Sequence, residues 1–215
     1  MSATGSPYSE DASLAERLRD AAERLSTQAT GLAVLAIIVA IVLALATWSV
    51  QDPSLSHATT APLVLVGLNV LVYRVEIAQG GGLGVGSAAI IYDWGLFGPA
   101  VADGEWYRIV TSGFLHGGLI HLGFNMYLLW ILGGALERYA GTGRMLAIYF
   151  SALLWGSALV LVITPNSLTI GASGAVFGLM AAMLLLERQR GIALLGAPHL
   201  AVAALLPPRC CLWTP

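Results

Sequence analysis

Lysine is absent from this 215-residue sequence, and charged residues of any kind make up only 10% of it. Ten arginines and twelve acidic residues leave a formal net charge of -2, with no basic run that would hold a nucleic acid. The two cysteines are the adjacent, near-terminal pair Cys210 and Cys211, which cannot staple a fold. These absences argue against a disulfide-stapled domain, and we expect no nucleic acid among the partners.

Apolar residues dominate instead, at 57% of the chain and a mean hydropathy of +0.79. This composition is typical of a polytopic membrane protein. At about 1.5 Å per residue, the first apolar run, residues 31–50, covers a hydrocarbon core of about 30 Å, whereas the last, residues 191–206, would rise only about 24 Å. Further runs occupy residues 61–77, 118–136, 145–163 and 171–186. We therefore predict an all-α, polytopic membrane helix bundle.

Polar segments divide the chain into four parts. Residues 1–29 form a polar tail whose leucines at positions 14, 18 and 25 fit a short amphipathic helix on the membrane surface or, equally well, a solvated tail. Residues 30–60 hold a first span and a polar turn, and residues 61–206 hold the main membrane domain. Residues 207–215 differ in character from everything before them. We expect an integral, multi-pass protein of the cell membrane, in contact with the lipid bilayer.

A long glycine-rich connection, residues 79–117, separates the second predicted span from the third. Connections of this length are usually functional or disordered. Trp94, Phe97 and Trp106 make this one apolar, so we expect it to pack on the membrane interface or to dip into it. Just before it, Arg74 and Glu76 stand near the end of a span, where their side chains are expected to reach the interface.

A serine among small residues, in the run Gly171-Ala172-Ser173-Gly174, opens the apolar helix predicted at 171–186. A serine nucleophile requires a base that takes its proton and donors that hold the oxyanion. His121 and Asn125, four residues apart, project from one face of the span at 118–136 and supply two such donors, and the free N–H at the start of the serine helix is a third. Alternation of the spans places both helix starts at the same membrane face.

Each of these residues also has a purely structural explanation. Taken alone, Ser173 is more often a packing residue, His121 an interhelical hydrogen bonder and Asn125 a packing amide. His116, at the junction of the loop and the span, is expected to be structural. Gly174 and Gly178 form an edge of small residues that allows another helix to approach closely. The combination of the polar pair with the serine run is what favours a site.

Several motifs occur together in an order that resembles the rhomboid family of intramembrane serine proteases. They are Trp106-Tyr107-Arg108, then His116 with His121 and Asn125, then Gly133-Gly134-Ala135-Leu136-Glu137, then Gly141-Thr142-Gly143-Arg144, and finally Gly171-Ala172-Ser173-Gly174. The resemblance covers residues 61–190. It implies a six-span core, preceded here by one extra span, and a water-filled cavity in which transmembrane protein substrates are cleaved without a metal or a cofactor.

The resemblance also implies roles for individual residues. Ser173 would be the nucleophile, and His121, Asn125 and the backbone N–H of Ser173 would form the oxyanion site. The loop at 79–117 would be the membrane-embedded first loop of the family, with Trp106 and Arg108 as its structural signature. Arg144 would be an arginine that stabilises the fold.

One element of the family pattern is not found. The family pairs its serine with a histidine on the last core span, and His199 is the only histidine that follows Ser173 here. Helical rise leaves His199 about 12 Å short of the serine, beyond hydrogen-bond reach. We therefore expect the sequence to lack the last core span and the catalytic histidine, with a truncated or out-of-frame end at residues 207–215.

Three functions are compatible with these features. The first is a rhomboid-type serine endopeptidase, favoured by the retained serine, histidine and asparagine. The alternative is a non-catalytic rhomboid-like protein that binds membrane helices, favoured by the missing base. A small transporter or channel ranks last, because no span is interrupted in the paired manner of transporters and no acidic residue lies in the middle of a span.

Overall fold

The structure is a computed structural model that describes residues 60–84 and 86–190, together with single residues and short groups between 16 and 40. Those scattered N-terminal residues are helical and exposed. Most of the predicted tail at 1–29 and of the extra span at 30–60 lies outside the described residues. So do the partial span at 191–206, His199 and the end of the chain at 207–215.

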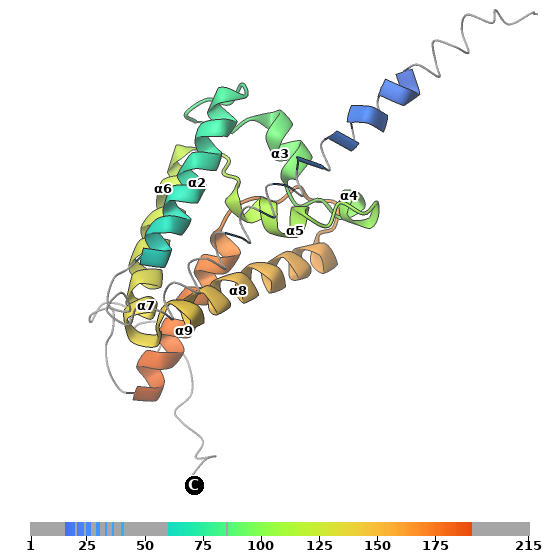
Figure 1. Cartoon of the computed structure of the whole chain (residues 1–215). Coiled ribbons are helices and arrows are strands. Elements are labelled where there is room, and N and C mark those ends of the chain that lie inside the picture. Colours follow the sequence, from blue (N-terminus) through green and yellow to red (C-terminus); the bar gives the residue numbers. More distant parts are fainter. Residues whose placement is uncertain are drawn as a thin grey trace, which may run out of the picture.

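Helices make up the described part of the chain, and no strand occurs within it (Figure 1). A single antiparallel bridge joins Leu96 to Thr169. In chain order the helices are α2 (Thr60–Ala78), α3 (Ala88–Trp94), α4 (Gly98–Ala102), α5 (Arg108–Thr111), a 3-10 turn at Ser112–Phe114, α6 (Leu119–Leu128), a π-helical turn at Leu129–Gly133, α7 (Gly134–Ala140), α8 (Thr142–Ile163) and α9 (Ser173–Arg190).

Three of these helices are long and apolar enough to cross a membrane. They are Thr60–Ala78, the continuous stretch Leu119–Ala140 and Thr142–Ile163, which confirms the spans predicted at 61–77, 118–136 and 145–163. The serine helix is confirmed as well, and α9 continues to Arg190, beyond the predicted end at residue 186. The all-α bundle predicted from the composition is therefore the observed fold.

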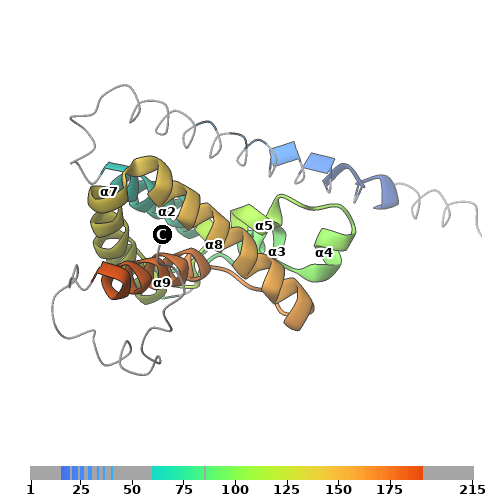
Figure 2. The ribbon, with the colours of Figure 1, turned by 90° about the horizontal axis from the view of Figure 1, so that it is seen from below.

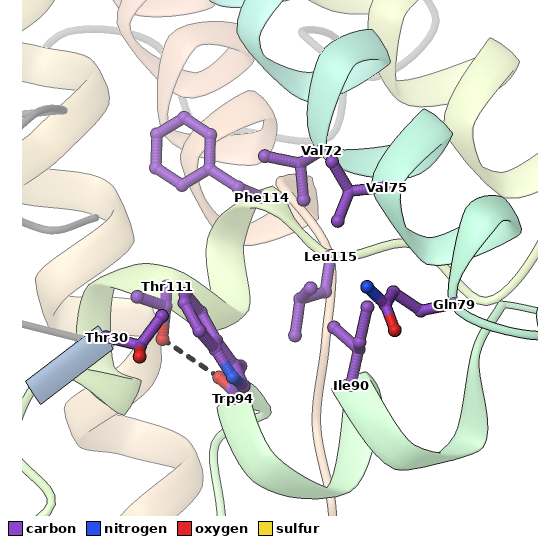
Figure 3. A pocket seen from close by; sticks show the side chains of 9 residues that line it. All are labelled: Thr30, Val72, Val75, Gln79, Ile90, Trp94, Thr111, Phe114 and Leu115. Carbon is purple, nitrogen blue, oxygen red and sulfur yellow. Dashed lines mark hydrogen bonds between the residues drawn. The ribbon is translucent and has the colours of Figure 1, made fainter. Parts of the chain in front are cut away.

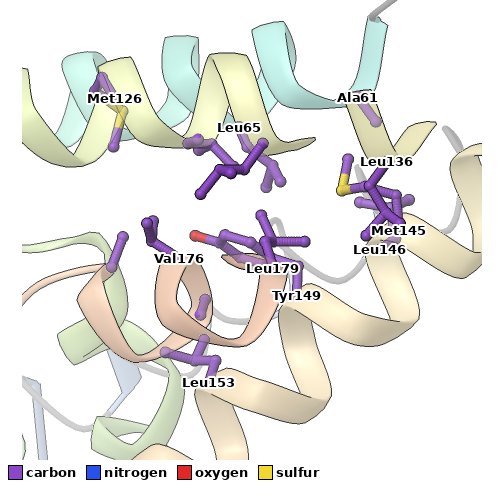
Figure 4. Close-up of a cluster of buried hydrophobic side chains, with 14 of the residues drawn as sticks. Ala61, Leu65, Met126, Leu136, Met145, Leu146, Tyr149, Leu153, Val176 and Leu179 are labelled. Carbon is purple, nitrogen blue, oxygen red and sulfur yellow. The ribbon is translucent and has the colours of Figure 1, made fainter. Parts of the chain in front are cut away.

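The bundle core lies where α2, α6, α8 and α9 meet (Figure 4). Leu65, Tyr149 and Leu179 are among its fully buried side chains. Leu122 from α6 and Val176 from α9 belong to the same cluster, so α6 and α9 share one packing surface. Because lipid tails are as apolar as leucine, dispersion contacts and close fit, more than exclusion of water, hold such helices together.

Small residues bring α8 and α9 into close contact, and the two helices run side by side in Figure 2. A methyl group on Gly156 would lie 3.5 Å from the Gly174 α carbon, and one on Gly174 would lie 3.9 Å from the Gly156 α carbon. A methyl group on Gly178 would come within 2.1 Å of the Ala152 Cβ. The small-residue edge predicted at Gly174 and Gly178 is thus confirmed, with α8 as the helix that approaches it.

The long connection after α2 folds into three short helices, α3, α4 and α5, on one side of the bundle (Figure 1). Arg108 holds it together, because its guanidinium donates to the carbonyls of Tyr92 at 2.6 Å and Gly95 at 2.9 Å and pairs with Glu105. Trp106 is 66% exposed, as an apolar anchor at the membrane interface would be. The loop is ordered around its arginine.

One sequence expectation for α2 is wrong. Arg74 is exposed, as predicted, but Glu76 does not reach the interface, because its side chain is completely buried. Its Oε1 accepts the backbone N–H of His116 at 3.1 Å. A carboxylate within a span is costly to bury unless it is hydrogen-bonded, and the loop end at His116 supplies that donor from 40 residues away.

Candidate active site at the start of α9

The segment that leads into α9 is fixed by backbone hydrogen bonds to the long connection. Thr169 and Leu96 exchange N–H to carbonyl bonds of 2.9 Å in both directions. Two residues further on, the Gly171 N–H donates to the Ser112 carbonyl at 2.8 Å. The residues just before Ser173 are therefore held against the folded loop.

Gly171 lies against the imidazole of His121. A methyl group at Gly171 would come within 2.8 Å of Cε1 and 2.9 Å of Nε2 of that ring. Gly171 also has a φ of +115°, a backbone conformation that side-chain-bearing residues rarely adopt. Both constraints require glycine. His121 of α6 therefore packs against the backbone at Gly171, two positions before Ser173 in the sequence.

Ser173 is the first residue of α9 and is partly exposed. The N–H groups of the first turn have no intrahelical acceptor and carry the positive end of the helix dipole, so they favour a developing negative charge. Ser173 also lines a cavity of about 230 Å³, together with Gly171, Ser157 and Phe177 among others. Ser173 thus borders space that a ligand could occupy.

Asn125 lies one turn after His121 on α6 and is buried. Its Nδ2 donates to the His121 carbonyl at 2.9 Å. A carboxamide carries two N–H donors, so one remains for another acceptor. Within the described part of the chain, no hydrogen bond joins the Ser173 hydroxyl to either Asn125 or His121.

His116 lies directly behind His121. The two rings meet edge to face, with centroids 5.1 Å apart and an interplanar angle of 61°. His116 is completely buried, and within the described residues neither ring nitrogen makes a hydrogen bond of good geometry. Burial, reinforced by the nearby His121, lowers the pKa of His116 from 6.5 to about 4. This imidazole is therefore neutral near pH 7.

The described residues include two of the four histidines, His116 and His121, whereas His57 and His199 lie outside them. Within the described residues, neither the imidazole of His116 nor that of His121 is hydrogen-bonded to the Ser173 hydroxyl as a general base would be. Among those same residues, no group of three histidine, cysteine or acidic side chains is placed to hold a metal ion.

A second, larger cavity of about 360 Å³ lies between α2 and the loop helices (Figure 3). Val72 and Val75 of α2 form one wall, and Ile90 and Trp94 of α3 face them. It shares no lining residue with the cavity beside Ser173. The larger cavity is thus a separate, mainly apolar space.

The sequence identified Ser173, His121 and Asn125 as candidates. In the structure, His121 lies against residues 169–173, the segment that leads into α9 and is called the serine segment below. Nothing in the sequence indicated the loop contacts at Leu96 and Ser112 that fix this segment, because a bridge between backbone atoms leaves no pattern in the side chains. A glycine two residues before the serine was the only visible signal for the close approach of the imidazole.

The fold and the site define the class of protein: an integral membrane helix bundle with a serine at a helix start beside an imidazole from a neighbouring span. Comparison with known families agrees, because the family described as "Rhomboid domain" matches residues 103–207. This match, over just under half of the chain, supports a rhomboid-type protein.

Individual proteins that resemble the chain are also named as rhomboid proteins. The chain is 46% identical over 84 residues to the rhomboid protease GluP of Bacillus subtilis, covering 39% of this chain and 16% of that protein. It is 38% identical over 100 residues to the putative rhomboid protease YdcA of the same organism, covering 46% and 50%. RHOMBOID-like protein 6, mitochondrial, of Arabidopsis thaliana is 42% identical over 84 residues, covering 39% and 27%. The chain spans half or less of the length of each of these relatives.

Proposed function

We propose that the protein is an intramembrane serine endopeptidase of the rhomboid type, with Ser173 as its nucleophile. The observation that carries the proposal is the contact between the His121 ring and Gly171, which places an imidazole beside the first turn of the serine helix. The cavity of about 230 Å³ next to Ser173 offers room for a peptide segment. The similarity to proteins named as a rhomboid protease and a putative rhomboid protease supports the same class of reaction.

In this reaction the Ser173 Oγ attacks the carbonyl carbon of the scissile peptide bond and passes its proton to a general base. The carbonyl oxygen then carries the negative charge. His121 and Asn125 donate hydrogen bonds to that oxygen, and the backbone N–H of Ser173 adds a third donor at the positive end of α9. The Asn125 amide keeps its bond to the His121 carbonyl, which orients it. The described residues do not identify this base.

Transmembrane protein segments are the proposed substrates, because the serine lies on a bundle whose three long apolar helices are suited to a bilayer. A substrate helix has to unwind locally before a peptide bond can enter a cavity of this size, since helical carbonyls are engaged in hydrogen bonds. The proposed location is the cell membrane.

The test is covalent labelling of the purified full-length protein with a fluorophosphonate, followed by mass spectrometry of the labelled peptide. We expect labelling at Ser173, none in Ser173→Ala, and rates about tenfold to a thousandfold lower in His121→Ala and Asn125→Ala. Ser167→Ala is the matched control, since Ser167 is an exposed serine in the turn before the same helix. Equal labelling of wild type and Ser173→Ala would refute the assignment.

A helix-binding protein without catalysis is the second candidate, and the absence of a base from the described residues favours it. It predicts no labelling of Ser173, together with saturable binding of a transmembrane peptide in vesicles. Labelling at Ser173 would exclude this candidate.

A further inference from the structure

We propose that Glu76 and His116 form a positioning relay that holds the His121 imidazole over Gly171. The inference deepens the proposed function and rests on it, because it assigns to two buried groups the task of orienting a donor of the oxyanion site. Neither residue belongs to the serine segment itself. Glu76 comes from α2, and His116 comes from the end of the long connection.

The first step of the relay is the anchor on α2. Glu76 is completely buried, and its Oε1 accepts the His116 N–H at 3.1 Å. This bond fixes the backbone three residues before α6 begins at Leu119. A buried carboxylate without such a donor would be strongly disfavoured, so the bond is worth more here than at a surface. Glu76 thereby sets where His116 enters the site.

Gly86 packs against Glu76 and His116. A methyl group at Gly86 would come within 2.5 Å of the Glu76 Oε2 and 2.6 Å of the His116 carbonyl oxygen. The Gly86 N–H also donates to the Gly117 carbonyl at 3.3 Å. Three segments therefore meet at one point, and only glycine fits there. Gly84, two residues away, has open space where its methyl group would be.

The last step is the contact between the two rings. The edge-to-face arrangement of His116 and His121 is typical of aromatic pairs, and it restricts rotation of the more exposed His121 ring. On its other side, His121 is limited by Gly171. The ring is thus held between His116 and the serine segment. The contact between His116 and His121 is one of ring packing.

The experiment measures the second-order rate of fluorophosphonate labelling at Ser173 in the same full-length protein. His116→Ala is expected to lower this rate about tenfold, less than removal of the donor itself, while His116→Phe, which keeps a ring, retains most of it. Gly86→Ala is expected to behave like His116→Ala, and Gly84→Ala like wild type. Thermal midpoints recorded for every variant separate loss of positioning from loss of fold.

A double-mutant cycle provides the readout that a merely structural role would not move. If His116 acts through His121, then His116→Ala has no further effect on the labelling rate once His121 is already alanine. Independent, multiplying effects of the two substitutions would overturn the relay, as would equal rates for His116→Ala and wild type. Should His116→Ala fail to fold, Gly86→Ala in both backgrounds makes the same comparison.

Glu137→Ala is the matched control for Glu76→Ala, which removes the anchor. Glu137 is also a completely buried carboxylate on a span, but it accepts the N–H of Ala61 at the far end of α2. Glu76→Ala is expected to slow labelling, and Glu137→Ala is expected to lower stability without slowing it. Failure of the proposed function looks different, since wild type itself would then carry no label at Ser173.

Discussion

Substitution of Gly171 by alanine tests the geometry of the site most directly. The new methyl group would lie 2.8 Å from Cε1 and 2.9 Å from Nε2 of His121, closer than a carbon atom can approach without displacing the ring. A shift of about 1 Å in a catalytic group can cost about a hundredfold in rate. We therefore expect Gly171→Ala to lower fluorophosphonate labelling of Ser173 about a hundredfold.

Backbone strain at Gly171 has to be separated from the collision with His121. Gly104 provides the control, because its φ is +100°, against +115° for Gly171, and open space surrounds the position of its missing methyl group. Both alanine variants carry a strain of about 1–2 kcal/mol from this left-handed backbone region. Only Gly171→Ala is expected to slow labelling, whereas Gly104→Ala should lower the thermal midpoint alone.

A second background isolates the ring itself. Removing the imidazole with His121→Ala also removes the atoms that the Gly171 methyl group would strike. In that background Gly171→Ala should cause no further loss of labelling rate. Equal losses in Gly171→Ala and Gly104→Ala, or a full additional loss in the His121→Ala background, would refute the placement of His121 against the serine segment.

Three further outcomes follow from the packing and from buried charge. Gly178→Ala should destabilise the fold by about 1–3 kcal/mol, because its methyl group would overlap the Ala152 Cβ, and Ala152→Gly should restore the thermal midpoint. The pKa of His116 falls from 6.5 to about 4 on folding, so the folded state resists protonation of this imidazole. The unfolding free energy should therefore fall by about 3 kcal/mol as the pH drops from 6.5 toward 4. Thermal midpoints of His116→Phe should lack this dependence on pH. Arg108→Lys should lower the unfolding free energy by about 2 kcal/mol, since lysine cannot reach the Tyr92 and Gly95 carbonyls together, and unchanged chemical denaturation would contradict this.

The spans could be predicted from the sequence because a helix long enough to cross a bilayer leaves an uninterrupted apolar run. The run at 145–163, for example, became a helix that begins three residues earlier, at Thr142. The same reasoning located His121 and Asn125 on one face of α6, since their spacing of four residues is a property of the helix itself.

The interior of the long connection could not be predicted in this way. Its order depends on single long-range bonds, such as the guanidinium of Arg108 against the Tyr92 and Gly95 carbonyls and the bridge between Leu96 and Thr169. Such bonds involve backbone atoms that every residue carries, so no residue type marks them. Glu76 was misjudged for a related reason, because its partner is a backbone N–H rather than a basic side chain.

The two buried carboxylates explain how α2 is fixed against the helix formed by α6 and α7. Glu76, near the end of α2, accepts the His116 N–H just before α6 begins. Glu137, on α7, accepts the N–H of Ala61 at the start of α2 at 3.2 Å and the Thr142 hydroxyl at 2.7 Å. The two antiparallel helices are thus tied at both ends, each time by a carboxylate of one helix and a backbone N–H at the opposite end of the other. Dispersion forces between apolar helices are not directional, so helices in a bilayer can slide past one another at little cost. Hydrogen bonds to buried carboxylates resist such sliding, and the bond from His116 to Glu76 is the one that fixes the start of α6, the helix that carries His121.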